Sequence, residues 1–268
     1  MPPATTIPQA GASTGDATLA RVGWRLVPFL ALLYFVAFLD RVNVGFAALT
    51  MNEDIGLSAA AFGLGAGIFF MGYVLFEVPS NLILARVGAR RWIARIMITW
   101  GLLSAGMALV QTPMQFYVLR FLLGVAEAGF FPGIIYYLGC WFPGRFRARI
   151  LGAFLFALPV SGVIGAPLST ALLGLDAFGL AGWQWMFIIE GLPAVALGFV
   201  VLGYLTDRPS EAGWLRREER EWLVAELARE QRAQEAVQRL SLRQSLTDRR
   251  VWAFGFAYFG LVLSLYAV

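Results

Sequence analysis

Residues 24–47 read WRLVPFLALLYFVAFLDRVNVGFA, an apolar segment with one acidic and one basic residue near its far end. About 20 residues at 1.5 Å each cross the roughly 30 Å of hydrocarbon in a bilayer. Five further segments of this kind follow, at residues 58–84, 92–111, 115–139, 149–174 and 183–205. A seventh begins near Val251 and the sequence ends at Val268. The pattern predicts an all-α membrane protein with six complete spans and the start of a seventh.

The composition supports this class. Of the 268 residues, 59% are hydrophobic and 14% are charged, against about 45–50% and about 25% in soluble domains. The chain has no histidine and one cysteine, Cys140, so it offers neither histidine-based metal or haem sites nor an internal disulfide. No His-Glu-x-x-His motif or acidic metal cluster stands out, so we expect no enzyme, metal or cofactor. The net charge of +4 comes from arginines in short loops, which does not indicate nucleic-acid binding.

Arginines gather in alternate connections between the apolar segments. The opposite connections, near residues 52–54 and 176, carry acidic side chains and no arginine. By the positive-inside rule, the N-terminus and the arginine-rich connections are predicted to be cytoplasmic. The arginines concerned are Arg21, Arg25, Arg86, Arg90, Arg91, Arg95, Arg145, Arg147 and Arg149.

Four regions follow from these patterns. Residues 1–20, rich in Pro, Ala, Thr and Gly, are predicted to be a disordered tail. Residues 21–205 form the six-helix bundle, and residues 206–250, with near-balanced charge, form a cytoplasmic amphipathic linker. Residues 251–268 are the beginning of a seventh membrane helix.

Small residues and prolines inside the spans predict close helix contacts and local breaks. The small residues repeat at four-residue spacing in Ala59, Gly63 and Gly67, in Gly124 and Ala128, and in Gly129 and Gly133. The prolines are Pro132, Pro159, Pro167 and Pro193.

Six ionisable residues fall within the spans, namely Asp40, Arg41, Glu77, Arg120, Glu127 and Glu190. Each costs about 2.5–3.5 kcal/mol at the centre of a membrane helix, so each requires a partner or water. Glu127 follows Arg120 by two helical turns, about 10.5 Å, on the same face. The charged residues of the first and fourth spans have two interpretations. They form either a static salt-bridge network that joins these spans, or a polar cavity with two cations and two titratable carboxylates. For Glu77 and Glu190 a helix-end or interhelical hydrogen bond is favoured.

The order of several motifs resembles the anion:cation symporter branch of the major facilitator superfamily, and most closely its sugar-acid, tartrate and phthalate permeases. The likeness extends over residues 24–225. The motifs are Leu39-Asp40-Arg41-Val42-Asn43, Gly72-Tyr73, Phe76-Glu77-Val78-Pro79-Ser80-Asn81, Gly88-Ala89-Arg90-Arg91-Trp92, Arg120-Phe121, Glu127-Ala128-Gly129-Phe130-Phe131-Pro132-Gly133 and Gly182-Trp183-Gln184-Trp185. One departure is Ala85, which stands before Arg86 where the superfamily usually has an aspartate.

The resemblance implies two six-helix bundles with a substrate site between them. It implies that Asp40 and Glu127 are proton-coupling groups and that Arg41, Tyr73 and Arg120 contact the substrate. The sequence would then be the N-terminal half of the transporter, and a C-terminal half or second bundle would be a required partner.

The charges agree with a symporter of small organic anions such as sugar acids or tartrate-like dicarboxylates. Two arginines and two ionised carboxylates sum to zero, whereas protonating both carboxylates leaves a charge of +2 that suits an anion. We therefore expect proton-coupled import across a bacterial-type inner membrane, with sodium coupling the less supported alternative. A non-transporting membrane subunit or sensor, or an inactive fragment, is the alternative function.

Overall fold

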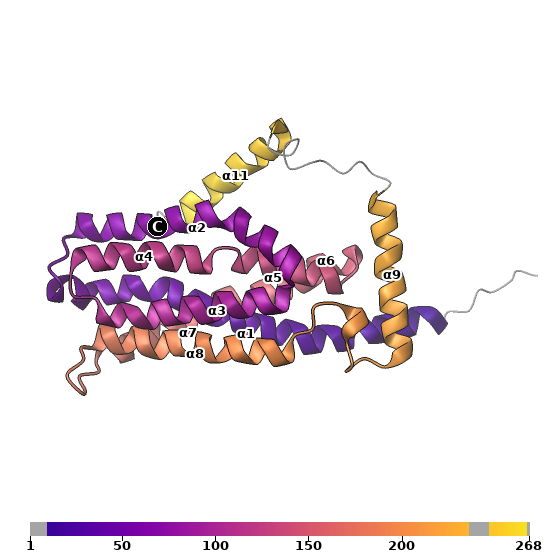
Figure 1. Ribbon diagram of the computed structural model, residues 1–268, viewed down its shortest axis with the longest axis horizontal. Coiled ribbons are helices and arrows are strands. Elements are labelled where there is room, and N and C mark those ends of the chain that lie inside the picture. Colours follow the sequence, from indigo (N-terminus) through magenta and orange to yellow (C-terminus); the bar gives the residue numbers. More distant parts are fainter. Residues whose placement is uncertain (1–9, 236–246, 267–268) are drawn as a thin grey trace, which may run out of the picture. The chain divides into compact units, whose positions relative to one another are not determined.

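A computed structural model describes residues 10–235 and 247–266 as a succession of helices (Figure 1). Their bounds are α1 (Ala10–Asp54), α2 (Ala59–Val87), α3 (Ala89–Gly106), η1 (Met107–Leu109), α4 (Pro113–Glu127), α5 (Phe130–Trp141), α6 (Gly144–Leu155), α7 (Ala157–Leu173), α8 (Gly182–Tyr204), η2 (Pro209–Glu211), α9 (Arg217–Glu235) and α11 (Arg249–Tyr266). Six helical segments are long and apolar enough to cross a membrane. The predicted all-α class and its six spans are confirmed.

The first helix begins earlier than the composition predicted. Helix α1 starts at Ala10, so residues 10–20 are helical where a disordered tail was expected, and residues 1–9 lie outside the described residues. A tertiary contact explains the difference: Gly15 is so close to the Trp222 indole of α9 that an added Cβ would lie 2.5 Å from the ring. The first helix is therefore supported beyond the apolar segment by the polar region that follows the bundle.

Two of the six spans are interrupted, and proline accounts for both interruptions. A proline cannot donate to the carbonyl four residues earlier, and its ring clashes with that carbonyl in a continuous helix. Pro132 lies four residues after Ala128, and α4 ends and α5 begins around residues 128–129. Pro159 lies four residues after Leu155, the last residue of α6. Pro167 and Pro193, in contrast, lie within the continuous helices α7 and α8.

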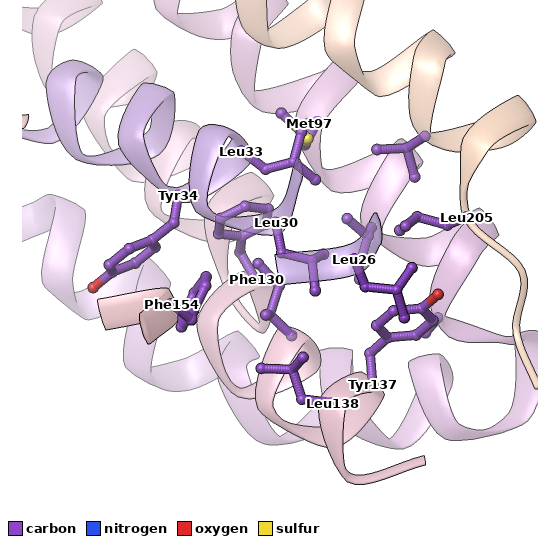
Figure 2. Packing of buried hydrophobic residues seen from close by; sticks show 14 of the residues in the cluster. Leu26, Leu30, Leu33, Tyr34, Met97, Phe130, Tyr137, Leu138, Phe154 and Leu205 are labelled. Carbon is purple, nitrogen blue, oxygen red and sulfur yellow. The ribbon is translucent and has the colours of Figure 1, made fainter. Parts of the chain in front are cut away.

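The described residues fall into two compact units that divide between Leu227 and Ala228. In the first unit, α1 lies at the centre of the main hydrophobic core. Its Leu26, Leu30 and Leu33, spaced by one helical turn, are fully buried. Figure 2 shows these side chains facing residues of α3 and α5, among them Met97 and Phe130. In the second unit, α11 covers Arg249–Tyr266, close to the predicted start of a seventh membrane helix.

Close helix contacts occur at only some of the predicted small residues. A methyl group at Gly124 of α4 would collide with the Phe69 carbonyl oxygen of α2, so these two helices touch through their backbones. Gly63 and Gly67 of α2, however, have nothing within 4 Å of an added Cβ in the described part of the chain. These two glycines lie on an outward-facing side of α2, whereas Gly124 of α4 faces α2. For Gly63 and Gly67 the close helix contact stays a prediction.

The arginine-rich end of the bundle is tied to the residues that follow α8. The Asp207 carboxylate accepts a 2.8 Å hydrogen bond from the Arg90 backbone N–H at the start of α3. The Arg25 guanidinium lies 4.6 Å from the Tyr204 ring centre and 4.7 Å from that of Trp214. Trp214 in turn stacks on Trp141 of α5 at 5.5 Å. The first part of the predicted linker therefore rests on the bundle.

Glu219 of α9 forms a second attachment, with an ion pair of 2.7 Å to Arg21 of α1. Burial opposes ionisation of this carboxyl. The Arg216 backbone N–H and guanidinium, each at 3.1 Å, and the nearby charge of Arg21 outweigh that burial and lower the pKa of Glu219. An ionised Glu219 therefore favours the attached arrangement of α9.

Candidate functional site

The break in the fourth span is the structural centre of the site. Helix α4 ends at Glu127, after which Ala128 leaves the helical conformation and Gly129 has a φ of 85°. The Ala128 carbonyl, which Pro132 leaves without a helical donor, accepts a 2.6 Å hydrogen bond from the Ser80 hydroxyl of α2. Ser80 is itself held by a 2.9 Å bond from the Trp92 indole N–H. These hydrogen bonds hold the break in place, with Glu127 at the last position of α4.

Glycine is required at position 129 for two reasons. The positive φ is unfavourable for residues with a Cβ. An added Cβ would also overlap the Ser80 hydroxyl. Gly129, two residues after Glu127, is therefore constrained both by its backbone conformation and by the closeness of the Ser80 side chain.

Arg41 and Glu127 form an ion pair between α1 and α4, through Arg41 Nη2 and Glu127 Oε1. The Glu127 side chain is 4% exposed, whereas the Arg41 side chain is 22% exposed. The Tyr73 ring of α2 lies 5.2 Å from the Arg41 guanidinium carbon. Three of the predicted site residues, on three different helices, are therefore in contact.

Asp40 points to a different neighbour. It is buried, and its carboxylate accepts hydrogen bonds from the Trp100 indole and the Ser104 hydroxyl, both of α3. A third bond, of 3.1 Å, comes from the Asn43 side-chain amide. In the described part of the chain Asp40 forms no ion pair with an arginine. The adjacent residues Asp40 and Arg41 thus serve separate contacts, as expected from their separation of about 100° around the helix.

Arg120 is buried in α4, with its guanidinium carbon 4.6 Å from the centre of the Phe69 ring. Among the described residues no carboxylate forms an ion pair with it, and its Nε atom has no hydrogen-bond partner. Asp40, Glu127 and Arg41 all lie within electrostatic reach of this cation. Arg120 therefore adds a positive charge near the two carboxylates without forming an ion pair with either of them in the described part of the chain.

Two further ionisable residues lie in the spans. Glu77 of α2 is half-buried and within electrostatic reach of Arg41, and its backbone carbonyl accepts a 2.8 Å bond from the Asn81 amide. Glu190 of α8 is buried and accepts a 2.9 Å hydrogen bond from the Ser169 hydroxyl of α7. For Glu190, the favoured interhelical hydrogen bond is what the structure contains.

Uncharged partners hold Asp40 and the Glu127 break, and none of them was predicted to have this role: Trp100, Ser104, Asn43 and Ser80. Asn43 and Ser80 occur in the family motifs without an assigned role. The available signal was the spacing of Trp100 and Ser104, which lie four residues apart and so on one face of an apolar helix.

The fold and the charged cluster together define a multi-pass helical membrane protein whose interior holds an arginine and carboxylates. The chain belongs to the Major Facilitator Superfamily, whose family model matches residues 30–268. Its family and its named relatives are transporters rather than enzymes.

Among curated proteins, the chain is 61% identical over 251 residues to a protein of Agrobacterium vitis named "Putative tartrate transporter". The match covers 93% of this chain and 58% of that relative. The chain is 50% identical to the metabolite transport protein NicT of Pseudomonas putida, with 94% and 58% covered. The chain thus spans little more than half the length of these relatives.

A solved structure shares the fold. It is a bacterial homologue of the human lysosomal transporter Spinster, in an inward-facing and occupied conformation, with a TM-score of 0.63 and 21% identity. The match covers 69% of this chain and 44% of that one.

Proposed function

We propose that this chain is the first bundle of a proton-coupled transporter that imports a small organic anion. The observation that carries the proposal is the ion pair between Arg41, which is partly exposed, and Glu127, which is buried. A substrate carboxylate and the Glu127 carboxylate would compete for the same guanidinium.

That competition provides a route to coupling. Drawing Arg41 away from an ionised Glu127 would leave a buried carboxylate without its partner, a loss of about 3–5 kcal/mol in comparable buried pairs. A proton on Glu127 removes the charge and with it this cost. Proton and anion then bind more tightly together than separately, which is the linkage that symport requires.

Arg120 and Asp40 supply the rest of the charge balance. Arg120 adds a second cation beside Glu127 and Asp40, so protonating both carboxylates would leave two positive charges at the site. Two positive charges suit a dicarboxylate, and planar guanidinium groups bind carboxylates through paired hydrogen bonds. Tyr73, against the Arg41 guanidinium, is positioned to contact the same substrate.

The substrate class is a small carboxylate of the tartrate or sugar-acid type. The charges favour it, and the name of the Agrobacterium vitis relative supports it. Protons are the proposed coupling ion because Glu127, which pairs with Arg41, and Asp40, which lies within electrostatic reach of Arg120, are buried carboxylates able to take a proton.

A second bundle is proposed as the partner that completes the site. In the most apolar 18 residues of the spans Ala59–Val87 and Gly144–Leu173, 17% and 22% of the residues are buried inside the bundle. The corresponding share is 39–56% in the other four spans. These two spans therefore offer the largest uncovered apolar surface for a further set of helices. The length of the curated relatives agrees with such a partner.

For the membrane, we propose a bacterial-type inner membrane with the N-terminus in the cytoplasm. The bacterial relatives support the location, and the arginine bias of the connections supports the orientation.

The test is uptake by a fused transporter, in which residues 1–268 are joined to the part of the Agrobacterium vitis relative beyond its match. Purified protein in liposomes would be assayed with labelled tartrate, sugar acids and a neutral sugar, under an inward proton gradient, an inward sodium gradient, or neither. Accumulation of an acid driven by the proton gradient supports the proposal. Uptake driven only by sodium, or preference for the neutral sugar, would contradict it.

A further inference from the structure

A groove lies between the first part of α1 and residues 142–153, at the end of α5 and along α6. Its volume is about 530 Å³, within the range of about 300–1,000 Å³ that is typical of small-molecule sites. Most of its walls are apolar, and they include the buried side chains of Leu19, Val27 and Phe142. Asp16 and Arg149 line the same groove. The groove thus combines apolar walls with one anion and one cation.

The groove lies at the arginine-rich end of the bundle, where the apolar segments of α1 and α6 begin. Gly23 of α1 faces α6, since a Cβ added to it would lie 3.7 Å from the Ile150 side chain. The next residue, Trp24, also lines the groove and is 82% exposed. Exposed tryptophans are typical of the boundary between lipid headgroups and hydrocarbon. The groove therefore opens at the level of a membrane surface.

The charged side chains follow a definite order along this end of α1. Arg149 precedes Ile150 and so lies at about the level of Gly23. Asp16 precedes Gly23 by seven residues of the same helix, which places it about 10.5 Å further from the apolar segment. Val27, about one turn on the other side of Gly23, continues the groove toward the hydrocarbon. Apolar walls, a cation and an anion thus succeed one another toward the water.

Both charges are available to a ligand. In the described part of the chain Asp16 and Arg149 form no ion pair, either with each other or with another side chain. Both side chains are exposed, so a ligand reaches them without breaking an ion pair of the fold. The neighbouring Arg21, in contrast, is paired with Glu219. The ligand that matches this groove carries an apolar chain, then a negative charge, then a positive charge.

We propose that the groove binds one phospholipid of the phosphatidylethanolamine type. An acyl chain lies along the apolar walls, Arg149 binds the phosphate and Asp16 binds the ammonium. Guanidinium groups bind phosphate through paired hydrogen bonds, and an ammonium donates charge-assisted hydrogen bonds to a carboxylate. Basic pockets at the surface of a membrane protein are suited to lipid headgroups. The site is independent of the proposed proton coupling.

The two charges also give the groove a preference among phospholipids. Phosphatidylglycerol has a phosphate for Arg149 but no cation for Asp16. Phosphatidylcholine has a cation whose methyl groups leave it no hydrogen to donate to the Asp16 carboxylate. Phosphatidylethanolamine satisfies both side chains, so we expect it to be retained in preference to the other two.

Lipid retention by the purified chain tests this site without transport. The 268-residue chain would be equilibrated with equal amounts of phosphatidylethanolamine, phosphatidylglycerol and phosphatidylcholine, and the retained lipids counted by native mass spectrometry. We expect one retained phosphatidylethanolamine, preferred about fivefold over each of the others, which is the size of an exposed ion pair. Equal retention of the three lipids, a preference for either of the others, or no retained lipid would overturn the proposal.

Three variants test the parts of the groove separately. Asp16→Asn should abolish the preference for phosphatidylethanolamine over phosphatidylglycerol, and Arg149→Gln should lower the retention of all three lipids by about fivefold. Ala153→Trp fills the groove and should remove the bound lipid. Arg86→Gln and Asp176→Asn alter exposed charges outside the groove and should change neither the number nor the preference. Thermal melting of each variant checks that the bundle is folded, and unchanged retention in the three groove variants would overturn the proposal.

The alternative occupant of the groove is the proposed second bundle. The fused transporter distinguishes the two occupants, because helices seated in the groove would displace the lipid. We expect the fused transporter to retain phosphatidylethanolamine, and to lose it in Ala153→Trp. Loss of the lipid from the unaltered fused transporter would assign the groove to the second bundle and overturn the proposal.

Discussion

The Ser80 hydroxyl of α2 donates a 2.6 Å hydrogen bond to the Ala128 carbonyl of the fourth span. This bond replaces the helical donor that Pro132 cannot provide. It locks the end of α4 against α2 and so determines where the Glu127 carboxylate stands relative to Arg41.

Gly129→Ala should therefore disturb the bundle. We expect destabilisation of about 1–2 kcal/mol from the positive φ alone, and more from the overlap with Ser80. Thermal unfolding of the purified chain in detergent measures the effect. Gly139→Ala in α5 is the matched control, because nothing lies within 4 Å of a Cβ added at Gly139. Equal melting temperatures for the two variants would contradict this account of the break.

Arg120→Lys should lose most transport in the fused transporter, by at least about tenfold, or roughly 1.4 kcal/mol. The planar guanidinium lies over the Phe69 ring, and an ammonium reproduces neither this stacking nor the paired hydrogen bonds to a carboxylate. Initial uptake rates against substrate concentration measure the loss. Arg217→Lys, on the exposed face of α9, serves as the control. Normal apparent affinity in Arg120→Lys would mean that the anion is bound elsewhere.

The attachment of α9 to α1 should depend on pH through Glu219. Because its pKa is lowered in the folded chain, its contribution to stability is complete above the ordinary pKa of a glutamate and is lost as the pH falls through the lowered value. Arg21 and Arg216 are substantially exposed, so the ion pairs are worth no more than about 1 kcal/mol.

Melting temperatures of the chain and of Glu219→Gln should consequently differ at neutral pH and converge in acid. Glu221→Gln removes an exposed carboxylate from the same helix and should change the melting temperature little at any pH. A difference between the chain and Glu219→Gln that grows as the pH falls would reverse the sign of the predicted effect.

The 268-residue chain alone should insert into the membrane without transporting. Its six spans carry the arginine bias needed for insertion, but alternating access requires two bundles around a shared site. Membrane fractionation and uptake assays, in a strain that lacks related permeases, would check both points. Proton-dependent accumulation by a demonstrated monomer would contradict the requirement for a second bundle. Activity confined to a homodimer would mean that two copies of the chain can form the site.

Much of the fold could be predicted, because the length of an apolar segment and the position of a proline are read directly from the sequence. Apolar length alone identified six spans, and prolines at 132 and 159 indicated breaks that occur where each proline removes a donor. The early start of α1 was not predictable from composition, because it depends on the contact between Gly15 and Trp222, residues far apart in the sequence. Spacing likewise does not say which face of a helix has a neighbour within this chain, so the same four-residue pattern did not distinguish Gly63 and Gly67 from Gly124.

The candidate site was predictable in its members and not in its pairing. Ionisable residues in membrane helices are costly, which selected Asp40, Arg41 and Glu127. Which carboxylate meets which arginine depends on the lateral order and rotation of the helices, and these are not encoded in span lengths. Trp100, whose indole donates to Asp40, carries no charge, so the cost of placing a charge in the membrane gives no reason to select it.

The most direct test of the coupling role of the Arg41–Glu127 pair is a comparison of two transport modes in Glu127→Gln. In the fused transporter, exchange of labelled for unlabelled substrate at equal pH requires the site but no net proton movement. Accumulation under an inward proton gradient requires both. We expect Glu127→Gln to retain exchange and to lose accumulation, because the neutral amide resembles a permanently protonated Glu127. Accumulation at the level of the unaltered transporter would contradict the claim that Glu127 carries the proton.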